Sequence, residues 1–116
     1  MEKLELNISV KQLADLKGHK VTCIIHSLGG KRYLNKEYSN LRFSIHYPLD
    51  KDKAVEIVIP KAKSIADILV PLADTYKNVI YKDPKKYGVW GHCIEDLFFE
   101  GIVIKPNGIC ELFVGS

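Results

Sequence analysis

The chain has 116 residues, of which 47% are hydrophobic and 27% are charged. This is the size and balance of one globular domain, and it excludes a disordered chain. A domain of this size buries about two thirds of the surface that its unfolded form exposes, so it folds without disulfides or a structural metal. The net charge of +3 is well short of the dense basic stripe that nucleic-acid-binding proteins usually carry.

The N-terminal residues predict a short strand followed by a short helix. Leu4, Leu6 and Ile8 alternate with polar residues, and this period of two is typical of a strand. Ser9 and Gln12 have the spacing of a capping box, which predicts the start of an amphipathic helix.

The middle of the chain predicts three strands and a loop. Residues 20–26 are rich in β-branched side chains and largely apolar on both faces, which is typical of a central strand. Residues 27–40 contain two glycines and two asparagines and are expected to form an exposed loop. Alternating apolar residues predict strands over residues 41–47 and 55–59, and the turn-forming residues between them favour an antiparallel hairpin.

A long helix is expected next. Ser64 and Asp67 form a second capping-box pattern, and apolar residues then recur at steps of three and four as far as Ile80. Pro71 lies inside this pattern, so either the helix kinks there or a second helix begins at it. Asp83 and Pro84 mark the end of the helical pattern.

The C-terminal residues predict a hairpin that completes the fold. Residues 97–105 and 109–114 have strand-like patterns, and residues 106–108 supply a three-residue turn. The order of elements predicts a single α+β domain over residues 1–116, with a mostly antiparallel sheet of about five strands and one short and one long helix packed on one face.

Cysteine use and the N-terminus favour a cytoplasmic protein. Cys23, Cys93 and Cys110 are odd in number and form no CxxC pair, which argues against a secreted disulfide framework. We interpret all three as small buried hydrophobic residues. The N-terminus lacks the basic start and apolar run of a signal peptide, and no stretch approaches the roughly 18 apolar residues of a membrane span.

The last thirty residues concentrate the rare and reactive residue types. His92, Glu95, Asp96 and Glu100 offer nitrogen and oxygen donors that zinc or manganese accept. No second His or Cys stands at a zinc-site interval from them, and His92 and Cys93, being adjacent, point to opposite sides of an extended segment. We therefore expect no metal, no cofactor and no catalytic residue.

Trp90 lies between Gly88 and Gly91 in a link rich in turn-forming residues. The glycines allow the backbone to fold tightly around the indole. Trp90 either closes one end of the core or anchors a partner, since tryptophan is enriched among interface hot spots.

The aromatic residues of the predicted strands also allow two interpretations. They could offer stacking platforms for single-stranded nucleic acid, but no RNA-binding signature surrounds them. Core packing is favoured, because aromatic side chains dominate core burial. The residues concerned are Phe43, Tyr47, Phe98, Phe99 and Phe113.

The segment YGVWGHCIEDLFFEGI, followed by a hairpin ending in LFVGS, resembles the C-terminal region of small bacterial immunity proteins of polymorphic toxin and contact-dependent growth inhibition systems. The resemblance implies a cytoplasmic protein that binds one toxin domain, often a nuclease, and blocks it without performing chemistry. The toxin-binding surfaces of such proteins differ between members, so no residue role is carried over.

The leading hypothesis is a non-enzymatic protein that neutralises a cognate toxin domain, with Trp90, His92, Glu95, Asp96 and Glu100 as contact residues. Carboxylates suit the basic cleft of a nuclease, because they steer the encounter and mimic phosphate.

Two alternatives come from other classes of protein. One is a small nucleic-acid-binding module that uses sheet aromatics and loop lysines, a mode that weakens steeply with salt. The other is a small hydrolase or metal enzyme centred on His92 and Cys93. The loop lysines are Lys31, with Arg32 beside it, Lys51, Lys53, Lys61, Lys63, Lys82, Lys85 and Lys86.

Overall fold

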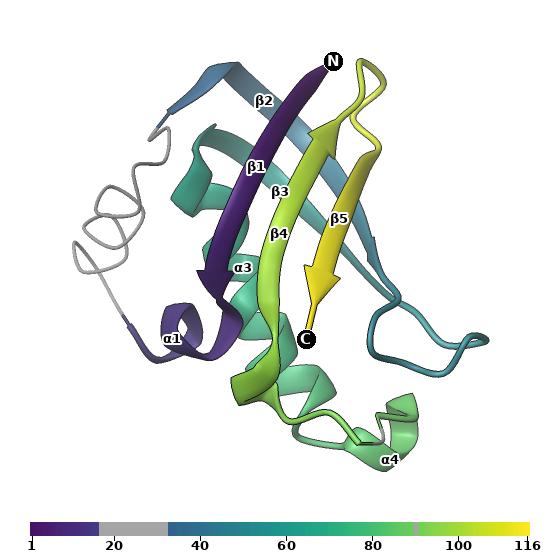
Figure 1. The fold of residues 1–116 in the computed structure, drawn as a ribbon. Coiled ribbons are helices and arrows are strands. Elements are labelled where there is room, and N and C mark those ends of the chain that lie inside the picture. The colour runs from purple at the N-terminus through teal and green to yellow at the C-terminus, as the bar shows by residue number, and fades with distance from the viewer. Residues whose placement is uncertain (17–32, 90) are drawn as a thin grey trace.

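The computed structural model describes residues 1–16, 33–89 and 91–116 (Figure 1). The predicted strand over residues 20–26 lies outside the described residues. The elements in chain order are β1 (Glu2–Ser9), α1 (Val10–Asp15), β2 (Tyr33–Ile45), β3 (Val55–Ser64), α3 (Ile65–Thr75), a π-helix η1 (Tyr76–Ile80), α4 (Pro84–Tyr87), a 3₁₀ helix η2 (Ile94–Asp96), β4 (Phe98–Ile104) and β5 (Cys110–Gly115).

The five strands of the described residues form two antiparallel sheets, β1-β4-β5 and β2-β3. The sheets meet where β2 runs beside the start of β5. An isolated parallel bridge joins Arg42 to Ile109, and the Arg42 amide donates to the Gly108 carbonyl at 2.9 Å. The predicted α+β fold with about five mostly antiparallel strands is confirmed, and the described strands are divided between two sheets that this one bridge joins.

The helices cover one face of the strands, as predicted. In Figure 1, α3 passes behind the strands, with α1 beside it. The ring of Tyr76 packs edge-on against Phe99 with 6.1 Å between ring centroids, and its hydroxyl donates to the Tyr47 carbonyl at 2.6 Å. The largest fully buried side chains come from both layers and include Leu13, Leu41, Phe43, Ile45, Ile65, Ile68, Leu69, Leu72, Tyr76, Ile80, Leu97 and Phe99.

Both predicted helix starts are confirmed. The Ser9 hydroxyl accepts from the Gln12 amide at 3.2 Å. At α3 the capping box is complete, because Ser64 Oγ accepts from the Asp67 amide at 3.2 Å and the Asp67 carboxylate accepts from the Ser64 amide at 3.0 Å. Burial acts to raise the pKa of Asp67, but hydrogen bonds from Lys63 and Ser64 outweigh it and hold this pKa below its ordinary value.

The long helix continues through Pro71, so the alternative in which a second helix begins there is wrong. Ile68 and Leu69 before the proline and Leu72 and Ala73 after it are all buried. Their packing offsets the backbone hydrogen bond that proline removes. After Thr75 the helix continues as the π-helix η1 to Ile80.

The prediction of a loop over residues 27–40 is wrong from Tyr33 onward, because β2 begins there. Residues 33–40 pair with the end of β3, which continues to Ser64 and places Lys61 and Lys63 in a strand. The pairing is irregular between residues 33 and 38, and Asn40 adopts a positive φ of 53°. The asparagines thus mark irregularities within a strand, since asparagine tolerates the left-handed conformation.

The C-terminal hairpin has the predicted turn. Gly108 has a φ of +83°, which glycine adopts without strain, and its amide donates to the Lys105 carbonyl at 2.9 Å. The Asn107 side chain accepts from the Ile109 amide at 3.0 Å. The hairpin places β5 between β4 and the edge of β2.

Candidate partner-binding surface

The residues predicted to contact a partner fall on different parts of the molecule. Trp90 lies outside the described residues, so both interpretations of it stay open. His92 precedes η2, Glu95 and Asp96 form part of η2, and Glu100 lies in β4.

The His92 side chain is half-buried and packs against Tyr47. The two rings meet edge-on with 5.5 Å between centroids, and the His92 carbonyl accepts from the Tyr81 hydroxyl at 3.2 Å. Tyr47 in turn exchanges a hydrogen bond of 2.6 Å with Ser116. Burial, as the largest cause, raises the pKa of Tyr81 to about 12. These contacts hold the link before η2 against the turn that follows β2.

Glu95 and Asp96 are exposed at the start of β4, on the side where α1 lies. The Val10 amide at the start of α1 donates to the Leu97 carbonyl at 3.1 Å, which fixes η2 against the helix. The Lys11 ammonium bonds Asp15, which raises the pKa of Lys11, and Glu95 adds to this shift through its charge. Glu95 therefore shares its surroundings with a lysine.

Glu100 lies on the face of β4 that points away from the helices, which we call the outer face, and its side chain is directed toward β5. The register passes from Phe99 opposite Val114 to Gly101 opposite Phe113, so Glu100 has no residue directly opposite it. A side chain built at Gly115 would collide with the Glu100 carboxylate. Glu100 is thus directed over β5, away from the side of β4 that faces α1, and the predicted residues do not form one cluster.

The acids and the histidine do not assemble a metal site. Within residues 1–16, 33–89 and 91–116, no group of three His, Cys, Asp or Glu side chains could hold an ion. Glu95, Asp96 and Glu100 are exposed carboxylates, and their separation suits electrostatic binding of a partner better than coordination of a metal ion.

The three cysteines have different surroundings. Cys110 is buried as predicted, its thiol donates to the Gly108 carbonyl at 3.6 Å, and burial raises its pKa to about 11. Cys93 is exposed, so its interpretation as a buried residue is wrong, because the link before η2 lies at the surface. Cys23 lies outside the described residues.

The outer face of the strands is a surface that sequence reasoning did not single out. The aromatic residues were expected in the core, and Phe43 and Phe99 are there, but Phe98, Tyr47 and Phe113 are 39%, 38% and 48% exposed. Side chains alternate along a strand, so Phe98 points to the opposite face from Phe99. The helices of the described residues lie on the inner face and leave this surface uncovered.

Acidic and apolar side chains share this outer face. Phe113 lies over Gly101, where a Cβ would be 3.6 Å from its ring. Val58 and Ile109 are 57% and 44% exposed. The glutamates of the face are Glu5, Glu56, Glu100 and Glu111. The alternation of side chains along each strand could have indicated this surface, because every second residue of such a strand points away from the core.

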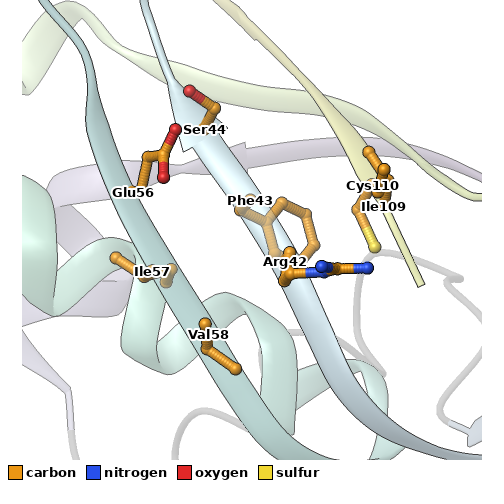
Figure 2. Close-up of a pocket in the computed structure, with 8 residues that line it drawn as sticks. All are labelled: Arg42, Phe43, Ser44, Glu56, Ile57, Val58, Ile109 and Cys110. Carbon is orange, nitrogen blue, oxygen red and sulfur yellow. The ribbon is translucent and has the colours of Figure 1, made fainter.

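A groove crosses the outer face where the two sheets meet (Figure 2). Its volume is about 260 Å³, and it lies between Val58 on β3 and Ile109 at the start of β5. In Figure 2 the Arg42 side chain extends toward β5, whereas Glu56 lies beside Ser44. The lining residues are Arg42, Phe43, Ser44, Glu56, Ile57, Val58, Ile109 and Cys110.

Exposed lysines gather at one end of the molecule. The Asp50 amide in the β2–β3 turn donates to the Tyr87 carbonyl at the end of α4, at 3.1 Å. Figure 1 shows this turn and α4 at the same end. The bond brings together the lysines of two segments, namely Lys51, Lys53, Lys82, Lys85 and Lys86.

No protein-family model, no curated protein and no solved structure matches this chain. Among the described residues, no helix combines the length and the apolar character that crossing a bilayer requires.

Proposed function

We propose that this chain is a non-enzymatic, cytoplasmic binding protein that neutralises a cognate bacterial toxin domain by covering its active site. The observation that carries the proposal is the outer face of the strands, where exposed apolar side chains stand beside glutamates. An apolar centre with charged surroundings is the anatomy of a protein–protein interface.

The distribution of charge supports a basic partner. The chain carries a net charge of +3, but lysines collect around α4 while Glu5 and Glu100 lie on the three-stranded sheet, where Glu111 is paired with Lys105 at 2.9 Å. A local acidic surface is sufficient to steer a basic toxin cleft toward this face, since screening confines surface electrostatics to about 10 Å. Glu95 and Asp96 add exposed carboxylates at the start of β4, on the side where α1 lies.

The contact residues proposed for this interaction are Trp90, His92, Glu95, Asp96 and Glu100. The two η2 acids and Glu100 would meet basic groups of the toxin. His92 would contact the toxin from the position in which its ring packs against Tyr47.

The test uses the protein domain encoded immediately upstream of this chain. Adding this protein in equimolar amount should abolish the toxic activity of that domain in vitro, and the two should co-elute on gel filtration. Glu100→Lys should weaken the complex about tenfold or more, because it reverses a charge within the contact.

The matched control is Glu37→Lys, which reverses a charge at an exposed position of β2. This variant should bind as the wild type does. Full activity of the toxin domain in the presence of excess protein would refute the proposed function.

A nucleic-acid-binding module is a second candidate, and the lysines gathered around α4 and the β2–β3 turn favour it. Binding of a labelled single-stranded oligonucleotide should then weaken steeply between low and physiological salt, and Lys85→Glu should weaken it further. Absence of any mobility shift at low salt would eliminate this candidate.

A further inference from the structure

The groove on the outer face lies at an interruption between two strands. β2 and β5 share one isolated bridge, at Arg42 and Ile109, whereas β2 pairs with β3 and β5 pairs with β4 along their lengths. Among the described residues, the ladder between β2 and β5 is not continued beyond this bridge. Facing strand edges that are not paired with one another can bond an extended segment of another chain.

The walls of the groove offer apolar contact on both sides. Val58 is 57% exposed on β3, and Ile109 is 44% exposed at the start of β5. A volume of about 260 Å³ accommodates one large apolar side chain, and it lies below the range of about 300–1,000 Å³ that is typical of small-molecule sites. The groove is therefore suited to a single anchoring side chain of a larger partner.

Two opposite charges line the groove. Arg42 lies between the apolar walls, opposite Val58 in the register and bridged to Ile109, and Glu56 lies further along β3, opposite Ser44. The Arg42 guanidinium donates to the Asn107 carbonyl at 3.3 Å, and Ser44 bonds His46 at 3.0 Å. Within the described part of the chain, neither Arg42 nor Glu56 takes part in an ion pair. The two side chains diverge in Figure 2, with Arg42 directed toward β5 and Glu56 beside Ser44.

We propose that this groove binds an extended segment of the partner protein, with an apolar side chain held between Val58 and Ile109, over the methylene groups of Arg42. An acidic side chain of the segment meets Arg42, and a basic side chain meets Glu56. The inference rests on the proposed function only in that the occupant is a protein. Charge complementarity at two separate points fixes the direction in which the segment lies.

A library of random linear peptides displayed on phage tests the groove without knowledge of the natural partner. Selection against the wild-type chain should enrich peptides that carry an apolar residue with an acidic and a basic residue near it. Synthetic versions of these peptides are then titrated by calorimetry.

The variant Val58→Glu should weaken the binding of the selected peptides about tenfold or more, since it places a charge on the apolar wall. The matched control is Val79→Glu, because Val79 is also an exposed valine, 41% exposed, but lies in η1. It should change the affinity less than about twofold, as expected of a surface position outside the contact. Thermal unfolding of both variants verifies that they are folded.

A charge exchange then tests the orientation. Arg42→Glu should weaken the binding of the selected peptide that has the highest affinity for the wild type. Replacing the acidic residue of that peptide by lysine should restore its affinity for the variant. Enriched peptides that bind Val58→Glu as well as wild type, or a library that yields no binder, would overturn the proposal.

Sedimentation distinguishes a second copy of the chain as occupant. A dimeric wild type together with a monomeric Val58→Glu variant would assign the groove to self-association and overturn the proposal. Failure of the upstream toxin domain to bind would refute the proposed function alone, since the peptide result does not depend on it.

Discussion

The two faces of the strands differ in what covers them. On the inner face, Phe43 and Phe99 pack beneath α3 and are almost completely buried. On the outer face, Val58, Ile109 and Phe113 remain between about two fifths and three fifths exposed, beside glutamates. The same strands therefore supply a core on one side and an unoccupied surface on the other.

This difference separates stability from binding. Apolar side chains on the inner face contribute to folding through burial and packing. Those on the outer face contribute little to folding, because water still reaches them. Substitutions on the two faces should therefore affect different measurements, and four predictions test whether the separation holds.

The largest expected effect comes from truncating a buried aromatic side chain. Phe99→Ala should lower the free energy of unfolding by about 3–5 kcal/mol, because it removes packing and leaves a cavity. Phe113→Ala, on the same sheet but 48% exposed, should cost less than about 1 kcal/mol. Urea denaturation followed by circular dichroism measures both, and equal losses would contradict the division between the faces.

The inner face of the described strands also contains a buried carboxylate, that of Glu2, whose removal should have the next largest effect. Glu2 accepts from the Asn35 amide at 3.1 Å and from the Tyr38 hydroxyl at 2.7 Å. Glu2→Gln should cost about 1–3 kcal/mol, since a charged acceptor is replaced at a buried site. Glu5→Gln, three positions along β1 and on the outer face, is the control and should change the unfolding free energy by less than about 0.5 kcal/mol.

A smaller effect is expected at the start of the helix that covers the inner face. Ser64→Ala removes the hydroxyl that accepts from the Asp67 amide and should cost about 1 kcal/mol. Ser44→Ala removes a hydroxyl on the outer face and should be nearly neutral in thermal unfolding. A larger loss from Ser44→Ala would show that the outer face also supports the fold.

The smallest effect is a change in how stability depends on alkaline pH. Burial, followed by the hydrogen bond to Glu2, raises the pKa of Tyr38 from 10.0 to about 12. Because the folded pKa lies above the unfolded value, this contribution is complete below pH 10 and is lost as the pH rises through about 12.

Tyr38→Phe should therefore lose less stability than wild type over that interval, as measured by urea denaturation at several pH values. Part of the fall should remain in the variant, because burial also raises the pKa of Tyr81 to about 12. Identical slopes for wild type and variant would contradict the assignment to Tyr38.

Much of the fold could be predicted from local patterns. The capping residues Ser9 and Ser64 placed the starts of two helices, and Gly108 placed the turn of the C-terminal hairpin. These features depend on hydrogen bonds within a few residues, so the sequence specifies them directly. The prediction failed over residues 33–40, where pairing with β3 and contact with Glu2 override the turn-forming tendency of asparagine.

The candidate site could be predicted only in part. Glu95, Asp96 and Glu100 are exposed as a contact surface requires, but local patterns did not indicate that Glu100 faces β5 while the other two lie toward α1. The groove was not predicted at all, because Arg42 and Val58 come from β2 and β3 and Ile109 directly precedes β5. Their proximity exists only after the sheets have met.

The sequence by itself determined the class of fold, the starts of the helices and which side chains alternate along each strand, because these follow from interactions between near neighbours. The tertiary structure alone decided which of the alternating faces the helices cover, and hence which apolar residues remain exposed. The physical reason is that covering a face depends on contacts between segments far apart in the chain, and residue spacing within one segment carries no information about them.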